Sequence, residues 1–216
     1  MDIKERYQAF GRYLQTAPAV AKTELLYATP FQLLVAMVLG AHCTDKRVNS
    51  CTPLLFKAFP TADHLAKASF NKVWAYIKSI SYARKKTRFL IQMAHQIATV
   101  FQHQIPASVT VLQTLPGVGR KTANAIVAIL YNKPTLAVDT HVFRVAKRTG
   151  LASCMAKTPL MVEKELMAQL PVRYIPIANR WIVLHGRYIC TARKPQCARC
   201  PLTHFCLYCQ NDQYKI

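Results

Sequence analysis

A lysine beside a glycine-containing turn is the first residue of this sequence with a chemical reason to be unusual. Lys121 follows the run Leu115-Pro116-Gly117-Val118-Gly119-Arg120, in a chain that has only 6 glycines. Pro116 is expected to end one helix, and a new helix is expected to begin at about residue 120. In the first turn of that helix, the macrodipole and Arg120 both disfavour an ammonium. A neutral amine could attack an electrophilic carbon and form a Schiff base, whereas a charged one would bind phosphate.

The turn before Lys121 is itself a candidate binding site. Gly117, Val118 and Gly119 precede a helix whose first backbone amides have no partner within the helix. Such amides form a nest for a phosphate oxygen and read no base sequence. A simple connection between two packed helices is the alternative. Arg120 and a formal net charge of +20 favour the phosphate site.

An aspartate further along the chain could assist a reactive lysine. Asp139 lies in Val138-Asp139-Thr140-His141-Val142-Phe143-Arg144, just before a helix expected from residue 141. The ordinary role of such a carboxylate is to cap the helix. If it lay near Lys121, it could instead take a proton from the lysine or from water. It could also stabilise positive charge that develops on the carbon under attack.

Cysteines concentrate near the end of the sequence. Five of the 8 fall in its last 27 residues, and they are Cys190, Cys197, Cys200, Cys206 and Cys209. One such cluster indicates metal binding rather than a disulfide framework, and Cys43, Cys51 and Cys154 are interpreted as structural. Two sets of four are possible, one from Cys190 to Cys206 and one from Cys197 to Cys209. Either set suits zinc or a [4Fe–4S] cluster, and either would pin a loop carrying Arg193, Lys194 and Arg199 onto a phosphate backbone.

Composition narrows the class of protein. The chain has 216 residues, 52% of them hydrophobic, and 29 Lys and Arg against 9 Asp and Glu. This excess of positive charge indicates a polyanionic partner. Neither end of the chain carries a basic amphipathic helix, which would favour a membrane, so nucleic acid is the expected partner. The charged first residues contain no secretory signal, and no apolar run reaches the roughly 20 residues of a membrane span. A cytoplasmic protein is expected.

Apolar residues recur at helical spacing throughout, so the chain is predicted to be nearly all α. Thr29-Pro30-Phe31-Gln32 combines an N-cap, a proline at the first helical position and a capping box, and a helix through about Leu39 should follow. Further helices are expected at about 5–15, 45–58, 62–67, 70–78, 84–101, 108–115, 120–131, 141–149, 159–169 and 173–187.

Taken together, the hairpin at Leu115–Asn124, the segment Val138–Arg144 and the spacing Cys190-x6-Cys197-x2-Cys200-x5-Cys206 resemble the endonuclease III family of helix–hairpin–helix DNA glycosylases. Thr23-Glu24-Leu25, Thr44-Asp45 and Leu184-His185-Gly186-Arg187-Tyr188 extend the resemblance along nearly the whole chain.

The resemblance implies a bifunctional glycosylase and AP lyase of base excision repair, acting on oxidised or ring-saturated pyrimidines. Lys121 would attack C1′ of the damaged nucleotide, Asp139 would be its carboxylate partner, and β-elimination from the imine would cut the strand. Cys190, Cys197, Cys200 and Cys206 would hold a [4Fe–4S] cluster, with Cys209 left over. The hairpin residues, His141 and Arg144 would bind damaged double-stranded DNA.

The resemblance also implies two all-α lobes. A six-helix barrel with the helix–hairpin–helix would span residues 24–133, and a cluster domain would combine 1–23 with 134–216. The protein would be monomeric and bacterial, and associated with the nucleoid. Two positions depart from the family: His42 stands where glutamine is common, and Tyr82 where a leucine wedge is common. Both would fill the gap left by a flipped base, and the aromatic ring of Tyr82 would stack there.

Two alternatives remain at this stage. A monofunctional relative would use water as its nucleophile, and such enzymes generally lack a lysine at the position of Lys121. A non-catalytic DNA-binding protein could keep the hairpin and the cluster, but it would have no need of Asp139.

Overall fold

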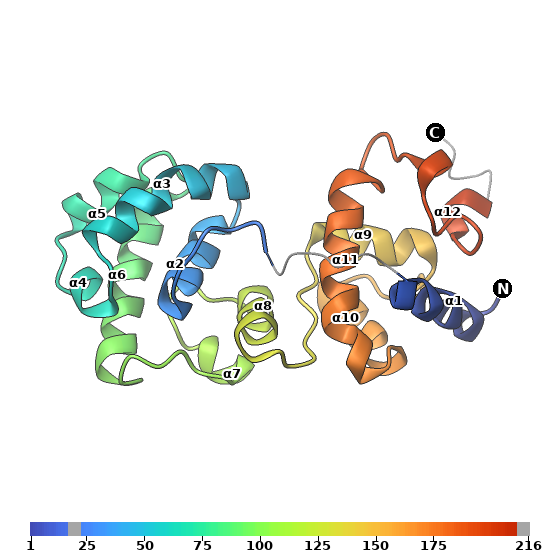
Figure 1. Ribbon diagram of the computed structural model, residues 1–216, viewed down its shortest axis with the longest axis horizontal. Coiled ribbons are helices and arrows are strands. Elements are labelled where there is room, and N and C mark those ends of the chain that lie inside the picture. Colours follow the sequence, from blue (N-terminus) through green and yellow to red (C-terminus); the bar gives the residue numbers. More distant parts are fainter. Residues whose placement is uncertain (17–22, 211–216) are drawn as a thin grey trace. The chain divides into compact units, whose positions relative to one another are not determined.

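The computed structural model describes residues 1–16 and 23–210, and the chain divides into two compact units. Unit 1 comprises Met1–Lys22 with Asn132–Ile216, and unit 2 comprises Thr23–Tyr131, so the chain passes between the units twice. The expected domain boundaries lie within two residues of this division. Every regular element in the described residues is a helix (Figure 1), which confirms the all-α prediction.

Unit 2 contains helices close to the expected positions. They are α2 (Pro30–Gly40), α3 (Asp45–Ala58), α4 (Ala62–Ala66), α5 (Phe70–Ile77), α6 (Ala83–Thr99), α7 (Val109–Leu112) and α8 (Arg120–Tyr131). The four-residue α7 is shorter than the helix expected at about 108–115. It ends well before Pro116, so the prediction that this proline ends the helix is wrong. Turn bonds from Thr114 N to Val111 O and from Leu115 N to Leu112 O follow the helix instead.

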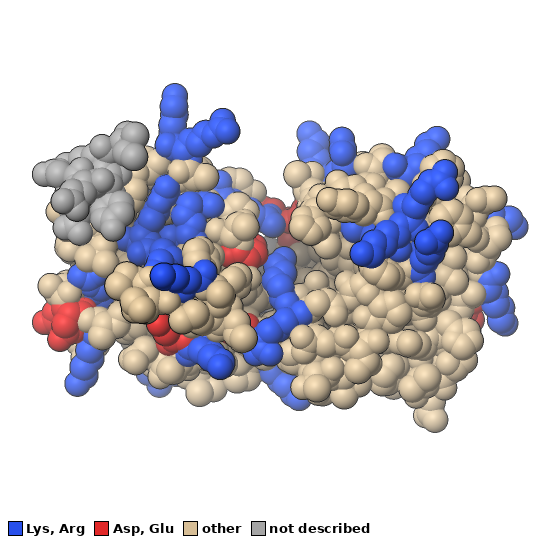
Figure 2. All heavy atoms as spheres, turned by 180° about the vertical axis from the view of Figure 1, so that it is seen from behind, with Lys and Arg blue, Asp and Glu red and all other residues tan. Residues whose placement is uncertain are grey.

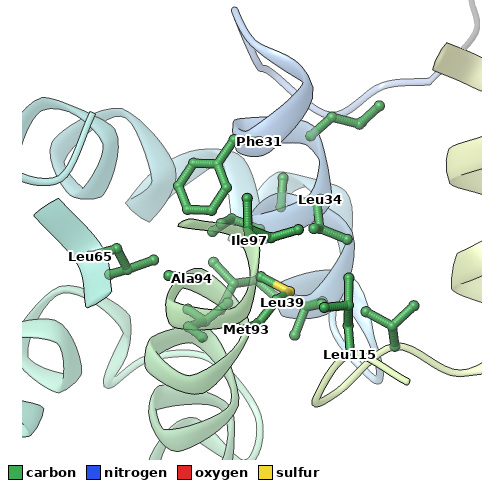
Figure 3. Close-up of a cluster of buried hydrophobic side chains, with 14 of the residues drawn as sticks. Phe31, Leu34, Leu39, Leu65, Met93, Ala94, Ile97 and Leu115 are labelled. Atoms are coloured by element: carbon green, nitrogen blue, oxygen red, sulfur yellow. The ribbon is translucent and has the colours of Figure 1, made fainter. Parts of the chain in front are cut away.

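The core of unit 2 forms around α2 and α6. Seven of the eleven residues of α2 are buried, because this helix is apolar on almost every side. The longer α6 is amphipathic, and α4 and α5 pack against it. Figure 3 shows side chains from α2, α4, α6 and the hairpin meeting in one cluster that includes Phe31, Leu34, Leu39, Leu65, Met93, Ala94, Ile97 and Leu115. This packing holds the segment before α8 in place.

Unit 1 has a separate core. Its elements are α1 (Ile3–Thr16), α9 (Thr140–Thr149), α10 (Pro159–Gln169), the 3₁₀ turn η1 (Val172–Tyr174), α11 (Ile175–Tyr188), the 3₁₀ turn η2 (Cys197–Arg199) and α12 (Leu207–Gln210). Helix α11 packs closely on α9, since a Cβ on Gly186 would lie 2.8 Å from Cβ of His141. The Trp181 ring in turn packs edge-on against Phe10 of α1, with ring centroids 5.8 Å apart.

Two local expectations needed correction. Thr29 caps α2 by accepting from Gln32 N, but the glutamine side chain accepts from Ala28 N at 2.8 Å, one residue before the position that a capping box requires. The helix expected from residue 173 starts instead as η1, and α11 begins at Ile175 with a proline in its first turn, where a missing amide costs nothing. Among the described residues, no helix is long and apolar enough to cross a membrane.

Candidate nucleic-acid interface, reactive lysine and cysteine cavity

The hairpin before α8 depends on one glycine. Gly117 has φ +82°, and a Cβ there would lie 3.0 Å from the ring of Phe89 and 3.1 Å from Val38. Gly119 has no positive φ and open space around it, so only Gly117 of this pair adopts a backbone conformation that favours glycine. Val118 is buried, and its amide donates to Leu115 O at 3.1 Å, so this amide stabilises the turn itself.

Lys121 lies directly after this hairpin, in the first turn of α8. The helix buries the opposite face through Ala123, Ile126 and Val127, while the side chains of Arg120 and Lys121 are exposed. The amine is therefore accessible from solvent and stands at the positive end of a three-turn helix. A ligand bound by the hairpin would lie beside it.

Asp139 is the N-cap of α9, as its ordinary role predicts. Its Oδ1 accepts hydrogen bonds from the backbone amides of His141 and Val142, both at 2.9 Å. The carboxylate is half-buried, and the cap makes no use of Oδ2. Asp139 belongs to unit 1 and Lys121 to unit 2. The cap therefore fixes the direction of the carboxylate within its own unit.

Arg144 has structural contacts that sequence reasoning missed. Its Nε donates to Cys190 O at 2.9 Å, and its Nη2 donates to Gly186 O at 2.7 Å. The same Nη2 lies 3.3 Å from Nδ1 of His141. Arg144 therefore ties α9 to the end of α11 and to the start of the cysteine loop. Contact of His141 and Arg144 with DNA stays a prediction.

All five C-terminal cysteines line one small cavity in unit 1. Arg148, Thr149, His185, Ile189 and Tyr208 are among the other residues around it. Burial raises the pKa of Cys200 to about 11, and the nearby thiols of Cys190, Cys209 and Cys197 add to this. Four thiolates can coexist in so dry a place only beside positive charge, which bound iron supplies. The donor set therefore fits a [4Fe–4S] cluster. Among the described residues, no three His, Cys, Asp or Glu side chains are placed to bind a single metal ion. A [4Fe–4S] cluster does not need such a group, because each thiolate binds its own iron.

Two residues to which the sequence assigned no role at the cysteines contact these thiols. Arg148 donates through Nη1 to Cys190 Sγ at 3.5 Å and to Thr191 O at 2.7 Å, and its guanidinium lies 4.6 Å from the centroid of the Tyr208 ring. His185 is buried, its Nε2 lies 3.5 Å from Cys200 Sγ, and its ring stacks on Trp181. Burial lowers the pKa of His185 to about 4, so its ring is neutral at pH 7. No motif spacing indicated either contact.

The two departures from the family pattern lie side by side in unit 2. The rings of His42 and Tyr82 pack edge to face with centroids 5.8 Å apart, and both residues have positive φ, 55° and 59°. Tyr82 is 68% exposed. Buried Lys86 donates to Leu39 O at 2.8 Å and also to Ala41 O, which holds the end of α2 just before His42. Non-glycine residues adopt such backbone conformations where the surrounding structure holds them. The pair therefore forms a fixed, exposed aromatic projection.

Positive charge dominates the surface. On the face drawn in Figure 2, Lys and Arg side chains are widespread and Asp and Glu are few, as 29 basic against 9 acidic residues require. Arg193, Lys194 and Arg199 are exposed on the cysteine loop, as expected. The hairpin in unit 2 and this loop in unit 1 each carry exposed basic side chains suited to a polyanion.

Comparison with known proteins identifies the family. Residues 35–171, more than half of the chain, match the HhH-GPD superfamily of base excision DNA repair proteins, and residues 190–206 match the iron–sulfur binding domain of endonuclease III. Endonuclease III of Rickettsia felis is 44% identical over 187 residues, which are 87% of each chain. Endonuclease III of Escherichia coli K12 is 37% identical over 86% of this chain and 87% of its own.

Solved structures agree with this assignment. A trapped covalent intermediate of endonuclease III with DNA has a TM-score of 0.89 and 34% identity, over 97% of this chain and 98% of that one. A thermostable thymine-DNA glycosylase, 19% identical with a TM-score of 0.85, shares the fold. With this fold, the hairpin and the spacing of Cys190–Cys206 in view, the chain belongs to the endonuclease III family, the iron–sulfur branch of the HhH-GPD base excision DNA repair proteins.

Proposed function

We propose that this base excision repair DNA glycosylase and AP lyase removes oxidised or ring-saturated pyrimidines, with Lys121 as its nucleophile and Asp139 as the carboxylate partner. The observation that carries the proposal is the exposed position of Lys121 at the start of α8, directly after the glycine hairpin, in a chain of the endonuclease III family. A helix N-terminus binds the phosphate of a strand, which would bring a sugar to the amine beside it.

In the proposed reaction, the neutral amine of Lys121 attacks C1′, and the bond from C1′ to the damaged base breaks. The ionised carboxylate of Asp139 first stabilises the positive charge on the sugar as the base departs. It then takes the proton that the attached amine loses and passes it to the ring oxygen. Opening of the sugar ring leaves an imine between Lys121 and C1′. Loss of a proton from C2′ then expels the 3′ phosphate, and water releases the lysine from the cut strand.

The [4Fe–4S] cluster belongs to unit 1, and we assign its four ligands to Cys190, Cys197, Cys200 and Cys206. When bound, it joins four thiolates and so braces the loop that carries them. Arg144 and Arg148 hold the start of that loop through Cys190 O and Thr191 O. The loop in turn would present Arg193, Lys194 and Arg199 to phosphates. The domain assignment follows: unit 2 is the barrel with the hairpin, and unit 1 is the iron–sulfur domain.

The aromatic pair of His42 and Tyr82 would occupy the gap that a flipped base leaves. Replacing Tyr82 by alanine should weaken binding to duplexes with an abasic site by roughly 10-fold, because stacking on one aromatic ring stabilises a base by about 1–3 kcal/mol. Binding to undamaged duplex should change little. Fluorescence anisotropy measures both, with Tyr76→Ala in α5 as a matched control. Equal loss on both duplexes would show that Tyr82 has no role at the gap.

The proposed partner is double-stranded DNA that contains a lesion, bound by a monomer. Solved relatives include complexes of endonuclease III with DNA, and the curated relatives are bacterial. Because an enzyme with this substrate would work on the chromosome, we infer that it acts in the bacterial cytoplasm at the nucleoid.

A panel of duplexes tests the proposed function. Each would carry thymine glycol, dihydrouracil, 5-hydroxycytosine, 8-oxoguanine or an abasic site, placed in turn opposite each of the four bases. The damaged pyrimidines should be excised and the strand cut without added alkali, giving the short product of β-elimination. Strands that break only after alkali would identify a monofunctional enzyme, and binding without any product would identify a non-catalytic protein.

A further inference from the structure

The fifth cysteine of the C-terminal cluster lies inside the cavity with the other four. Cys209 lines the same cavity as Cys190, Cys197, Cys200 and Cys206. Cys209 therefore lies in the same cavity as all four assigned cluster ligands. A cysteine left over from the family spacing would not need this position.

The local structure holds Cys209 there. It lies in α12, and its amide donates to Cys206 O at 3.1 Å. The two residues before it are both packed against the end of α9. A Cβ on Gly150 would lie 2.6 Å from Leu207, and Tyr208 stacks with the guanidinium of Arg148. These contacts hold α12 against α9, and the side chain of Cys209 lines the cavity.

Two sets of four cysteines therefore share one cavity. Cys197, Cys200 and Cys206 belong to both sets, which differ only in their fourth member, Cys190 or Cys209. The two candidates enter from opposite ends of the loop, because Cys190 follows α11 and Cys209 lies in α12. Cys190 is further distinguished by the Arg148 guanidinium, which donates to its Sγ at 3.5 Å.

We propose that Cys209 is a fifth cluster thiol, which binds the iron of Cys190 when that ligand is released or absent. In the exchange, the bond from iron to Cys190 Sγ breaks and a bond from the same iron to Cys209 Sγ forms. The proton of the Cys209 thiol passes to the released Cys190 thiolate, so the charge of the cluster and its oxidation state do not change. The loop then stays closed, with Cys197, Cys200 and Cys206 as permanent ligands and either Cys190 or Cys209 as the fourth.

Cysteine-to-serine variants of the full chain test this proposal through their metal content. Wild-type protein and Cys209→Ser should each contain about four irons per chain with matching sulfide. Cys190→Ser should keep most of that iron, with a shifted visible spectrum because one ligand has changed. The double variant Cys190→Ser with Cys209→Ser should lose most of its iron. Equal iron in the single Cys190 variant and the double variant, whether high or low, would overturn the proposal.

Matched variants make the result specific. Cys154 is exposed and outside the cavity, so Cys154→Ser should match wild type. Cys200 belongs to both sets, so Cys200→Ser should lose its iron although Cys209 is present, and retention there would contradict the assignment of Cys209 to the place of Cys190. If Cys190→Ser does not fold, the rate of iron release to a chelator is compared between the wild type and Cys209→Ser instead. Faster release from Cys209→Ser supports the proposal, and equal rates overturn it.

Discussion

Lys121→Ala should abolish borohydride trapping of a covalent complex with abasic-site DNA. The variant has no amine to form the imine that borohydride reduces, and excision should fall by roughly 10³-fold or more, which is about 4 kcal/mol of transition-state stabilisation. Lys121 is exposed, so the free energy of unfolding should change by no more than about 0.5 kcal/mol. Gel electrophoresis of the trapped complex and single-turnover excision measure the two effects.

Lys67→Ala removes another exposed lysine of unit 2 and provides the control for lost charge. It should trap as the wild type does. Trapping that survives in Lys121→Ala would assign the nucleophile to another amine. Loss of trapping in both variants would point to weakened DNA binding rather than to lost chemistry.

Asp139→Asn should lower the rate of excision by about 10²-fold or more, because it removes the charge assigned to proton transfer. Its effect on folding should be small. An asparagine oxygen can still accept from His141 N and Val142 N, where Asp139 Oδ1 accepts at 2.9 Å, and Asn is as good an N-cap as Asp. The free energy of unfolding from denaturant titration and single-turnover kinetics separate the two properties.

Asp139→Ala completes this test, because it removes the cap as well as the charge. It should lose about 1 kcal/mol of stability in addition to activity. If Asp139→Asn were fully active and only Asp139→Ala were impaired, the aspartate would be a helix cap and nothing more. That result would leave Lys121 without its proposed partner.

Most of the helical architecture was predictable because its determinants are local. Apolar residues at helical spacing predicted α3, α8 and α10 with the bounds that the structure has. Thr29 and Asp139 were recognisable as caps, since a cap bonds an amide within three residues of itself. Where local rules failed, tertiary packing was the reason. Gly117 faces Phe89 of α6 and Val38 of α2. The turn that contains it begins where α7 ends, at Leu112, and not at Pro116 as the local pattern predicted.

The sequence by itself indicated the proposed chemistry, through Lys121 after the hairpin, the spacing of the cysteines and a net charge of +20. Only the tertiary structure decided which residues support that chemistry. Arg144 reaches Cys190 across 46 residues of chain, and Lys86 reaches Leu39 across 47. Local patterns cannot specify such partners, because they depend on which helix faces pack together. The same packing placed Cys209, which spacing had left outside the proposed cluster, in one cavity with the other four C-terminal cysteines.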